Sequence, residues 1–382
     1  MPDAEKLAAV REALPALSAG IYLASGEVGP LPSETAAAMD EYAQRELRTG
    51  RGHPDDVEAA IERIDEARAG VAAILATDVD AVTLTHGASE ALARAVAEVD
   101  WRSGDRLLAI GRAEPSSTVA RSVADRLGVA LDAIEPVDDD GDDERVVEAV
   151  RAAIGPATRL VVVPHVLATT GARVPIERIA AEAHDAGAVV AVDGSQAVGA
   201  VPVVVEDSGA DFYAVAGEKW LLGPDGIGAL WTAPAHRGRG LGPVEFHTPS
   251  VVGFARSCGW LSMYVGLPWI HARGSVLAHA AAERLATIDG VELLTPRERM
   301  ATLVTFRIRG WPAEAALAEL GARVFAIAGA VPSLEAIRIG VGFFTTEDEL
   351  ERFASAVELL AAHMPSTLPP QPRLTIIGQD GR

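Results

Sequence analysis

The sequence predicts an α/β protein with a mostly parallel sheet, followed by a smaller α+β domain. Three observations lead to this prediction. Short apolar, β-branched runs recur over the first 230 residues, amphipathic helical patterns lie between several of them, and the alternation stops near residue 240. Apolar runs that are bounded by turns and separated by helices are typical of buried parallel strands with helices on both faces. The length of 382 residues also suits two domains.

In the first part of the chain, the apolar runs predict the strands and the amphipathic patterns predict the helices. Strand character is found in the runs 81–85, 106–110, 159–166, 188–193, 212–216 and 227–231. Helical periodicity covers 89–99, 116–128, 144–155 and 175–187. Because ligands of open parallel sheets bind at the carboxyl ends of the strands, the residues that follow these runs are candidates for a functional site.

The second part has a different pattern. We expect a long loop over 237–260 and a helix over 268–288, followed by strands at 302–308 and 337–344 and helices at 313–321 and 346–363. The predicted organisation is therefore a large domain at 15–245 and a small domain made of 1–14 and 246–364. The Pro-rich segment 365–382 is predicted to be a flexible tail.

The composition narrows the choice of partners. A net charge of −21 argues against a surface for nucleic acid or for an anionic membrane, since both need a basic patch. The sequence has neither a signal-peptide pattern nor an apolar run of 18 residues. Cys258 is the only cysteine and cannot form an intrachain disulfide, which favours the cytoplasm. We expect a small-molecule substrate and no metal site.

One lysine stands out chemically. Lys219 lies between the run "FYAVA" and a Gly-rich turn, and Lys6 is the only other lysine in the chain. A lysine in a buried, apolar setting loses part of its preference for the charged form, and its amine can then attack a carbonyl, including that of pyridoxal phosphate. The structural alternative is an ordinary lysine in a surface loop.

Two further features strengthen the catalytic interpretation. Asp193 ends the apolar run of "AVVAVD", where a carboxylate could face the pyridine nitrogen of that cofactor; a helix N-cap is the alternative. The stretch "THGASE" leads from a strand into a helix, whose N-terminal N–H groups can bind a phosphate. Each feature is weak alone, but the order of phosphate loop, Asp and Lys is specific.

With these motifs the chain resembles the class V aminotransferase family of fold type I pyridoxal phosphate enzymes, and within it the cyst(e)ine C–S lyases and cysteine desulfurases. The resemblance covers about 20–362 and rests on "IYLASGEVGPLP", "PHVLATTGARVPI", "VDGSQAVGAVPV", "DFYAVAGEKWLLGPDGIGALW" and "IRIGVGFFTTEDELERF". It implies a large domain with a mostly parallel seven-stranded sheet, a smaller α+β C-terminal domain, and a homodimer with active sites at the subunit interface.

The resemblance also implies roles around the cofactor ring. Lys219 would hold the cofactor by its aldehyde and move the proton at the substrate α-carbon, and Asp193 would pair with the pyridine nitrogen. Gln196 and Thr169 lie where family members bind the phenolic oxygen.

Further roles concern the phosphate and the substrate. Ala88 and Ser89 would contact the phosphate, and Arg338 would hold the substrate α-carboxylate, which its fork can bind in a bidentate manner.

Four positions depart from the family pattern. Glu218 replaces a His that helps to hold the phosphate, and Ala216 replaces a Ser or Thr. Val265 or Gly266 stands where a partner-subunit Thr completes the phosphate site, and Glu114 stands where an aromatic residue, often His, stacks on the ring.

An acidic side chain beside a phosphate costs about 1 kcal/mol or more in partly solvated surroundings. Glu218 must therefore turn away or be neutralised by a basic residue. The candidates for neutralisation are Arg256, Arg273, His247 and His271, although ordinary surface charge is their alternative interpretation.

We predict a pyridoxal phosphate lyase that cleaves the C–S bond of a sulfur-containing amino acid by α-proton abstraction and elimination. A persulfide-forming desulfurase is disfavoured, because Cys258 lies far from the region where desulfurases carry their acceptor cysteine. The alternatives are an aminotransferase or epimerase of the same family, or a degenerate homologue without activity. An epimerase needs a second acid, for which Glu114, His86 or a partner residue could serve.

Overall fold

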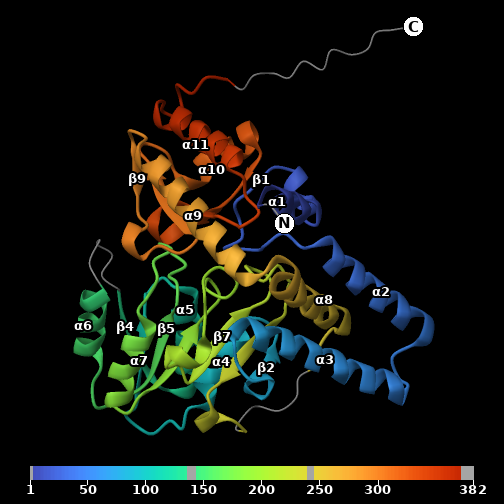
Figure 1. Ribbon diagram of the computed structural model, residues 1–382. Coiled ribbons are helices and arrows are strands. Elements are labelled where there is room, and N and C mark those ends of the chain that lie inside the picture. Colours follow the sequence, from blue (N-terminus) through green and yellow to red (C-terminus); the bar gives the residue numbers. More distant parts are fainter. Residues whose placement is uncertain (1–2, 136–142, 239–244, 371–382) are drawn as a thin grey trace.

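A seven-stranded sheet forms the centre of the larger domain in the computed structural model, which describes residues 3–135, 143–238 and 245–370 (Figure 1). Across the sheet the strands follow the order β2 (Val82–Thr85), β8 (Gly228–Thr232), β7 (Phe212–Ala216), β6 (Val189–Asp193), β5 (Thr158–Pro164), β3 (Arg106–Ile110) and β4 (Ala130–Ile134). Strand β8 is antiparallel to both of its neighbours, and the other pairs are parallel. The predicted mostly parallel sheet is confirmed.

Helices cover both faces of this sheet, which explains why its central strands are almost wholly apolar. One face packs against α4 (Ala88–Glu98) and α5 (Pro115–Leu127). The other face packs against α3 (Pro54–Leu75), α6 (Asp143–Ala153), α7 (Ile176–Asp185) and α8 (Thr248–Gly259). Strand β4 was not among the predicted runs, because it is a half-exposed edge strand and Asp132 interrupts its apolar residues.

The predicted long loop over 237–260 is wrong for its second half. Residues from Thr248 to Gly259 form α8, which continues into a π-helix at Trp260–Val265, while 239–244 lie outside the described residues. Two glycines within this segment lower its helix propensity and hide the helix in the sequence. The helix is instead favoured by its packing against α2 (Ser33–Thr49). A Cβ on Gly253 would lie 2.6 Å from Cγ of Met39, so this glycine permits close contact between α8 and α2.

The smaller domain has its own core and an antiparallel sheet, as the α+β pattern predicts. Its sheet has the order β12 (Gly329–Val331), β13 (Ala336–Gly340), β10 (Leu303–Ile308) and β9 (Val291–Leu293). Its helices are α9 (Leu267–Ala286), α10 (Ala313–Val324) and α11 (Glu347–Ala361). The chain start contributes β1 (Ile21–Tyr22), which pairs in parallel with β11 (Ala326–Ile327).

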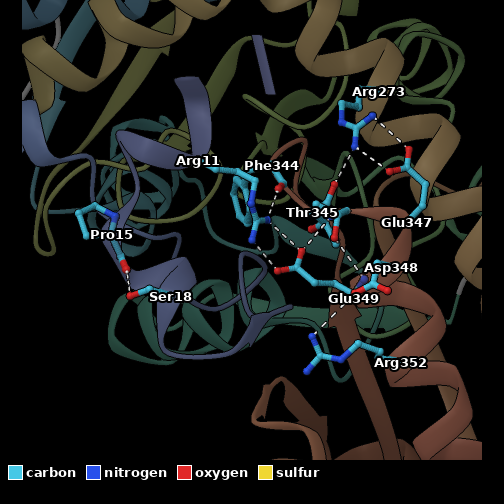
Figure 2. Close-up of polar contacts among 11 residues, drawn as sticks. Arg11, Pro15, Ser18, Arg273, Phe344, Thr345, Glu347, Asp348, Glu349 and Arg352 are labelled. Carbon is cyan, nitrogen blue, oxygen red and sulfur yellow. Dashed lines mark hydrogen bonds and ion pairs between the residues drawn. The ribbon is translucent and has the colours of Figure 1, made fainter. Parts of the chain in front are cut away.

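The N-terminal helix α1 (Asp3–Glu12) bridges the two domains. Arg11 binds both carboxylate oxygens of Glu349, at 2.9 and 2.7 Å, and the carbonyl of Phe344 at 2.7 Å (Figure 2). Val10 on the same helix packs into the core of the large domain. The domain boundaries at 14 and 245 stay a prediction, and most of the predicted tail, 371–382, lies outside the described residues.

No helix in the described ranges has the length and apolar character needed to cross a bilayer.

Candidate active site

Lys219 and Asp193 line one cavity at the carboxyl ends of β7 and β6, where the sheet topology predicts a ligand site. The cavity has a volume of about 160 Å³. The residues around it include His86, Gly87, Ala88, Ser89, Pro115, Ser116, Asp193, Ser195, Ala216, Glu218 and Lys219. The predicted order of phosphate loop, Asp and Lys thus becomes a spatial group.

Lys219 stands in a tight turn that the N-terminal loop clamps. The N–H of Gly217 donates to the carbonyl of Ile227 at 3.0 Å, and the N–H of Gly29 donates to the carbonyl of Glu218 at 2.7 Å. A Cβ on Gly29 would lie 2.2 Å from the carbonyl oxygen of Lys219, so this approach requires glycine. The Lys219 amine has no hydrogen bond or ion pair with any described residue and remains available to a ligand.

One carboxylate oxygen of Asp193 is hydrogen-bonded, and the other has no partner among the described residues. Its Oδ1 accepts hydrogen bonds from the N–H of Ser195 at 2.9 Å and from the Ser195 hydroxyl. Within the described part of the chain, Oδ2 has no hydrogen-bond partner, and the residue is 8% exposed. A carboxylate in this position favours a cationic partner, such as a protonated pyridine nitrogen.

The neighbouring His165, whose backbone N–H donates to the carbonyl of Asp193 at 2.9 Å, does not supply such a cation. Its Nδ1 lies 2.7 Å from the Tyr213 hydroxyl. Burial, followed by the charge of Arg173, lowers the pKa of His165 to about 4, so its ring is neutral at pH 7. The free carboxylate oxygen of Asp193 is therefore directed to whatever occupies the cavity.

The phosphate end is built by the start of α4. Gly87 is the N-cap, with a φ of +103° that favours glycine, and no side chain caps the helix. Ala88 and Ser89 line the cavity, and N–H groups of a first helical turn lack partners within their helix. This arrangement fits an anion such as a phosphate.

Glu218 does not fit that anion. It lines the same cavity, and its Oε2 is buried with no hydrogen-bond partner in the described part of the chain. None of the four basic residues proposed to neutralise it lines the cavity. Arg273 instead binds the carbonyls of Phe343 and Thr345 and pairs with Glu347 in the small domain (Figure 2). The residues at the ring end of the site fit pyridoxal phosphate. At the phosphate end, the carboxylate of Glu218 would repel the phosphate.

The two residues predicted at the phenolic oxygen are engaged elsewhere and do not line the cavity. Gln196 donates from Nε2 to the carbonyl of Gly26 at 2.7 Å and accepts from the Trp220 indole at 2.9 Å. The Thr169 hydroxyl donates to Glu114 at 2.6 Å. Their predicted contacts with the cofactor remain predictions.

Glu114 has a structural set of partners. It is 1% exposed, lies outside the cavity lining, and accepts hydrogen bonds from the backbone N–H groups of Ala168 and Thr169 at 2.7 and 3.0 Å. Burial raises the pKa of its carboxyl in spite of these bonds. The next two residues, Pro115 and Ser116, line the cavity in its place, and the Ser116 hydroxyl is buried without a partner. Sequence reasoning missed Ser116, whose signal is its place at the start of a helix after strand β3.

The guanidinium of Arg338 on β13 forms an ion pair with a glutamate. Its Nη1 donates to the carbonyl of Ala168, and its Nη2 pairs with Oε1 of Glu27. The Nε of Arg338 and the Oε2 of Glu27 are both buried without a partner in the ranges that the structure describes. Glu27 belongs to the loop "ASGEVGP", and no local pattern indicates this residue, because the pair joins positions 311 apart.

Neither Val265 nor Cys258 reaches the cavity. Val265 is buried at the end of the π-helix. Cys258 is fully buried and forms no disulfide, and burial raises the pKa of its thiol far above the usual value. A Cβ on Gly70 would lie 2.8 Å from the Cβ of Cys258, so this residue packs α8 against α3, as predicted for a small buried hydrophobe.

Comparisons with known proteins point in the same direction. The family model "Aminotransferase class-V" matches residues 21–240. A probable cysteine desulfurase of Methanothermobacter thermautotrophicus is 25% identical over 92% of this chain and 97% of that protein. An isopenicillin N epimerase of Streptomyces clavuligerus is 30% identical over 67% of this chain and 74% of that protein.

Solved structures share the fold. A mutant of C-DES with glycine covalently linked to its pyridoxal phosphate cofactor has a TM-score of 0.83 at 19% identity, over 91% of this chain and 98% of that one. The cystine C–S lyase C-DES in complex with its product cysteine persulfide also has a TM-score of 0.83 at 19% identity, over 90% and 99% of the two chains.

Proposed function

Because the chain belongs to the class-V aminotransferase family, whose members are enzymes that depend on pyridoxal phosphate, we propose that it is a lyase that cleaves the C–S bond of a sulfur-containing amino acid. The observation that carries the choice of a lyase is the burial of the one thiol. Cys258 is 0% exposed and lies outside the cavity, so no side chain of this protein is placed to accept sulfur as a persulfide. The sulfur then leaves with the product.

The proposed roles follow from the groups that are open to the cavity. When bound, the cofactor supplies a pyridine ring that withdraws electrons from the substrate α-carbon. Lys219 provides the amine that binds the cofactor aldehyde and that later takes the proton from this carbon. Asp193, oriented by Ser195, keeps the pyridine nitrogen protonated. The first turn of α4 at Ala88 and Ser89 binds the phosphate.

Arg338 is proposed to bind the substrate carboxylate, in competition with Glu27. One arm of the guanidinium already donates to Ala168 and the other to Glu27, so a carboxylate ligand must displace the Glu27 side chain. Once the substrate is bound, loss of the α-proton and departure of sulfur from the β-carbon leave an unsaturated amino acid, which water converts to a keto acid and ammonia. The sulfur group leaves with its electron pair and is protonated.

A second candidate is an epimerase, favoured by the 30% identity to an isopenicillin N epimerase. It would share Lys219 as the group that moves the α-proton and would need a second group on the other side. His86 lines the cavity, with its Nδ1 2.8 Å from Glu90, and is a candidate for this role. Glu114 is less suited because it lies outside the cavity lining.

The test is a product assay with the purified holoenzyme. L-cystine, L-cysteine and S-substituted cysteines should each be tested for keto acid and for released sulfide or thiol, with Lys219→Ala as the inactive control. A lyase forms equal amounts of keto acid and sulfur product without an amino acceptor. A need for an acceptor would instead indicate an aminotransferase, and formation of the D-amino acid would indicate an epimerase.

A homodimer remains part of this proposal. Several large apolar side chains are exposed on the described surface, among them Leu47 at 78%, Met263 at 89% and Val276 at 68%. None of the four basic residues proposed to neutralise Glu218 lines the cavity, so a second subunit is the proposed source of that charge. Light scattering of the holoenzyme should give twice the mass of 39.8 kDa, and a monomeric mass would contradict the expectation.

A further inference from the structure

We propose a second ligand site, in a cavity of about 630 Å³ between the two domains, that binds a small organic carboxylate with an apolar body. This volume lies in the range of small-molecule sites. The cavity shares no lining residue with the one that contains Lys219. The proposed function does not use this second cavity, and the inference is independent of it.

One wall is a polar stripe on helix α9. His271, Ser275 and His279 follow each other at intervals of four residues, which places them on one face of the helix, and all three line the cavity. Arg173, which pairs with Val166 in an antiparallel bridge after β5, also lines the cavity. Thr302 lies beside them, ahead of strand β10.

Two buried polar atoms in this cavity lack partners. The Nε2 of His271 and the hydroxyl of Thr302 are buried, and neither has a hydrogen bond with a residue that the structure describes. Thr302 is only 2% exposed, so bulk water does not compensate for the loss. A buried polar atom without a partner is costly, and a ligand that hydrogen-bonds to either atom would lower this cost.

The arginine of this cavity is available to an anion. Arg173 forms no ion pair with any described residue, although Glu298, the one carboxylate of the lining, stands at the same cavity. His271 is neutral at pH 7, because burial and then Arg173 lower its pKa to about 4, and it can serve as an uncharged donor. A guanidinium and neutral donors together match a carboxylate, which the arginine fork binds in a bidentate manner.

The apolar residues of the lining favour an organic ligand. The segment 200–202 and the residues Pro268, Ala272, Met300 and Ala301 present apolar surface to the same space. A small inorganic anion would leave these walls uncovered, whereas an apolar body attached to the carboxylate would bury them.

Calorimetric titration of the holoenzyme with benzoate and with its uncharged analogue benzamide tests the site. Benzoate should bind saturably, and benzamide should bind about tenfold more weakly or worse, because it lacks the charge that Arg173 recognises. Arg173→Gln should weaken benzoate to a similar extent. The exposed neighbour Arg297→Gln is the matched control, since Arg297 does not line the cavity, and it should leave the affinity unchanged.

A second pair of variants separates this cavity from the catalytic one. Thr302→Val, which keeps the shape of the side chain, should also weaken benzoate, whereas Arg338→Gln should not. Saturable binding that is lost in Arg338→Gln would place benzoate in the Lys219 cavity and overturn the proposal. No saturable binding, equal affinity for benzamide, or full affinity in Arg173→Gln would overturn it as well.

Discussion

The two ends of the proposed active site differ in how their charged groups are satisfied. At the ring end, the Lys219 amine and one oxygen of Asp193 have no partner among the described residues. At the carboxylate end, Arg338 already donates to Ala168 and to Glu27. One end is therefore preorganised for a ligand from outside, and the other is stabilised by the protein's own glutamate.

The difference has an energetic reason. An arginine this strongly buried, with 12% of its side chain exposed, is costly without a partner, and Glu27 supplies one in the absence of substrate. A lysine that must react with an aldehyde gains nothing from an internal partner, because a salt bridge would keep its amine protonated. At the Arg338 end, a substrate carboxylate must replace the carboxylate of Glu27. At the Lys219 end, a ligand binds groups that have no partner among the described residues.

The largest effect is expected at the open end, from Lys219→Ala. Activity should fall by about a thousandfold or more, because both cofactor attachment and proton transfer depend on this amine. Absorbance of the lysine-bound cofactor and its trapping by borohydride should vanish together. Lys6→Ala is the matched control, because Lys6 is the other lysine of the chain and stacks over Trp269. Normal cofactor trapping in Lys219→Ala would break the comparison.

Asp193→Asn should have the next largest effect. The amide keeps the hydrogen bonds with Ser195 but removes the charge that holds the pyridine nitrogen protonated. We expect kcat to fall about a hundredfold or more, with a shift in the cofactor spectrum. Ser195→Ala, which only loosens the carboxylate, should have a smaller effect of the same kind. An unchanged kcat in Asp193→Asn would remove this residue from the proposed site.

At the Arg338 end, Glu27→Gln should improve substrate binding, whereas the two preceding substitutions lower activity. Without the competing charge, Arg338 should bind the substrate carboxylate more tightly, and KM should fall by about tenfold or less. Arg338→Gln should raise KM. Steady-state kinetics of both variants provide the measurement. If Glu27→Gln left KM unchanged while Arg338→Gln raised it, the two carboxylates would not compete.

Glu218→Gln tests the acidic residue at the phosphate end. Its buried, unpaired oxygen opposes a phosphate with about 1 kcal/mol, and the amide should therefore tighten cofactor binding roughly fivefold. Titration of the apoenzyme with pyridoxal phosphate, followed by fluorescence, gives the affinity. Weaker binding would instead indicate that Glu218 makes a favourable contact that a second subunit completes.

The smallest effect on activity is expected from Cys258→Ala, which lies outside both ends. Because the thiol is buried between α8 and α3, its loss should lower the free energy of unfolding by about 1 kcal/mol and leave the specific activity close to that of the wild type. Thermal denaturation and the keto-acid assay provide the two readings. A loss of activity in a folded variant would return the persulfide mechanism to consideration.

The sequence predicted the elements and residues whose signals are local. Lys219 and Asp193 stand at the ends of apolar strands, and the geometry of a parallel sheet brings such ends together without knowledge of any other contact. The helix α8 escaped prediction because its two glycines lower its helix propensity, and the contact that requires Gly253 is made with α2, far away in the sequence.

By itself, the sequence determined most of the alternating strands and helices of the large domain, the lysine proposed to be reactive and the family to which the chain belongs. Tertiary structure alone decided which polar groups satisfy one another: Glu27 with Arg338, Glu114 with Thr169, and Gln196 with Gly26 and Trp220. These pairs join loops that are far apart in the chain. Their side chains form hydrogen bonds through proximity, and proximity between distant segments is fixed by packing and not by local pattern.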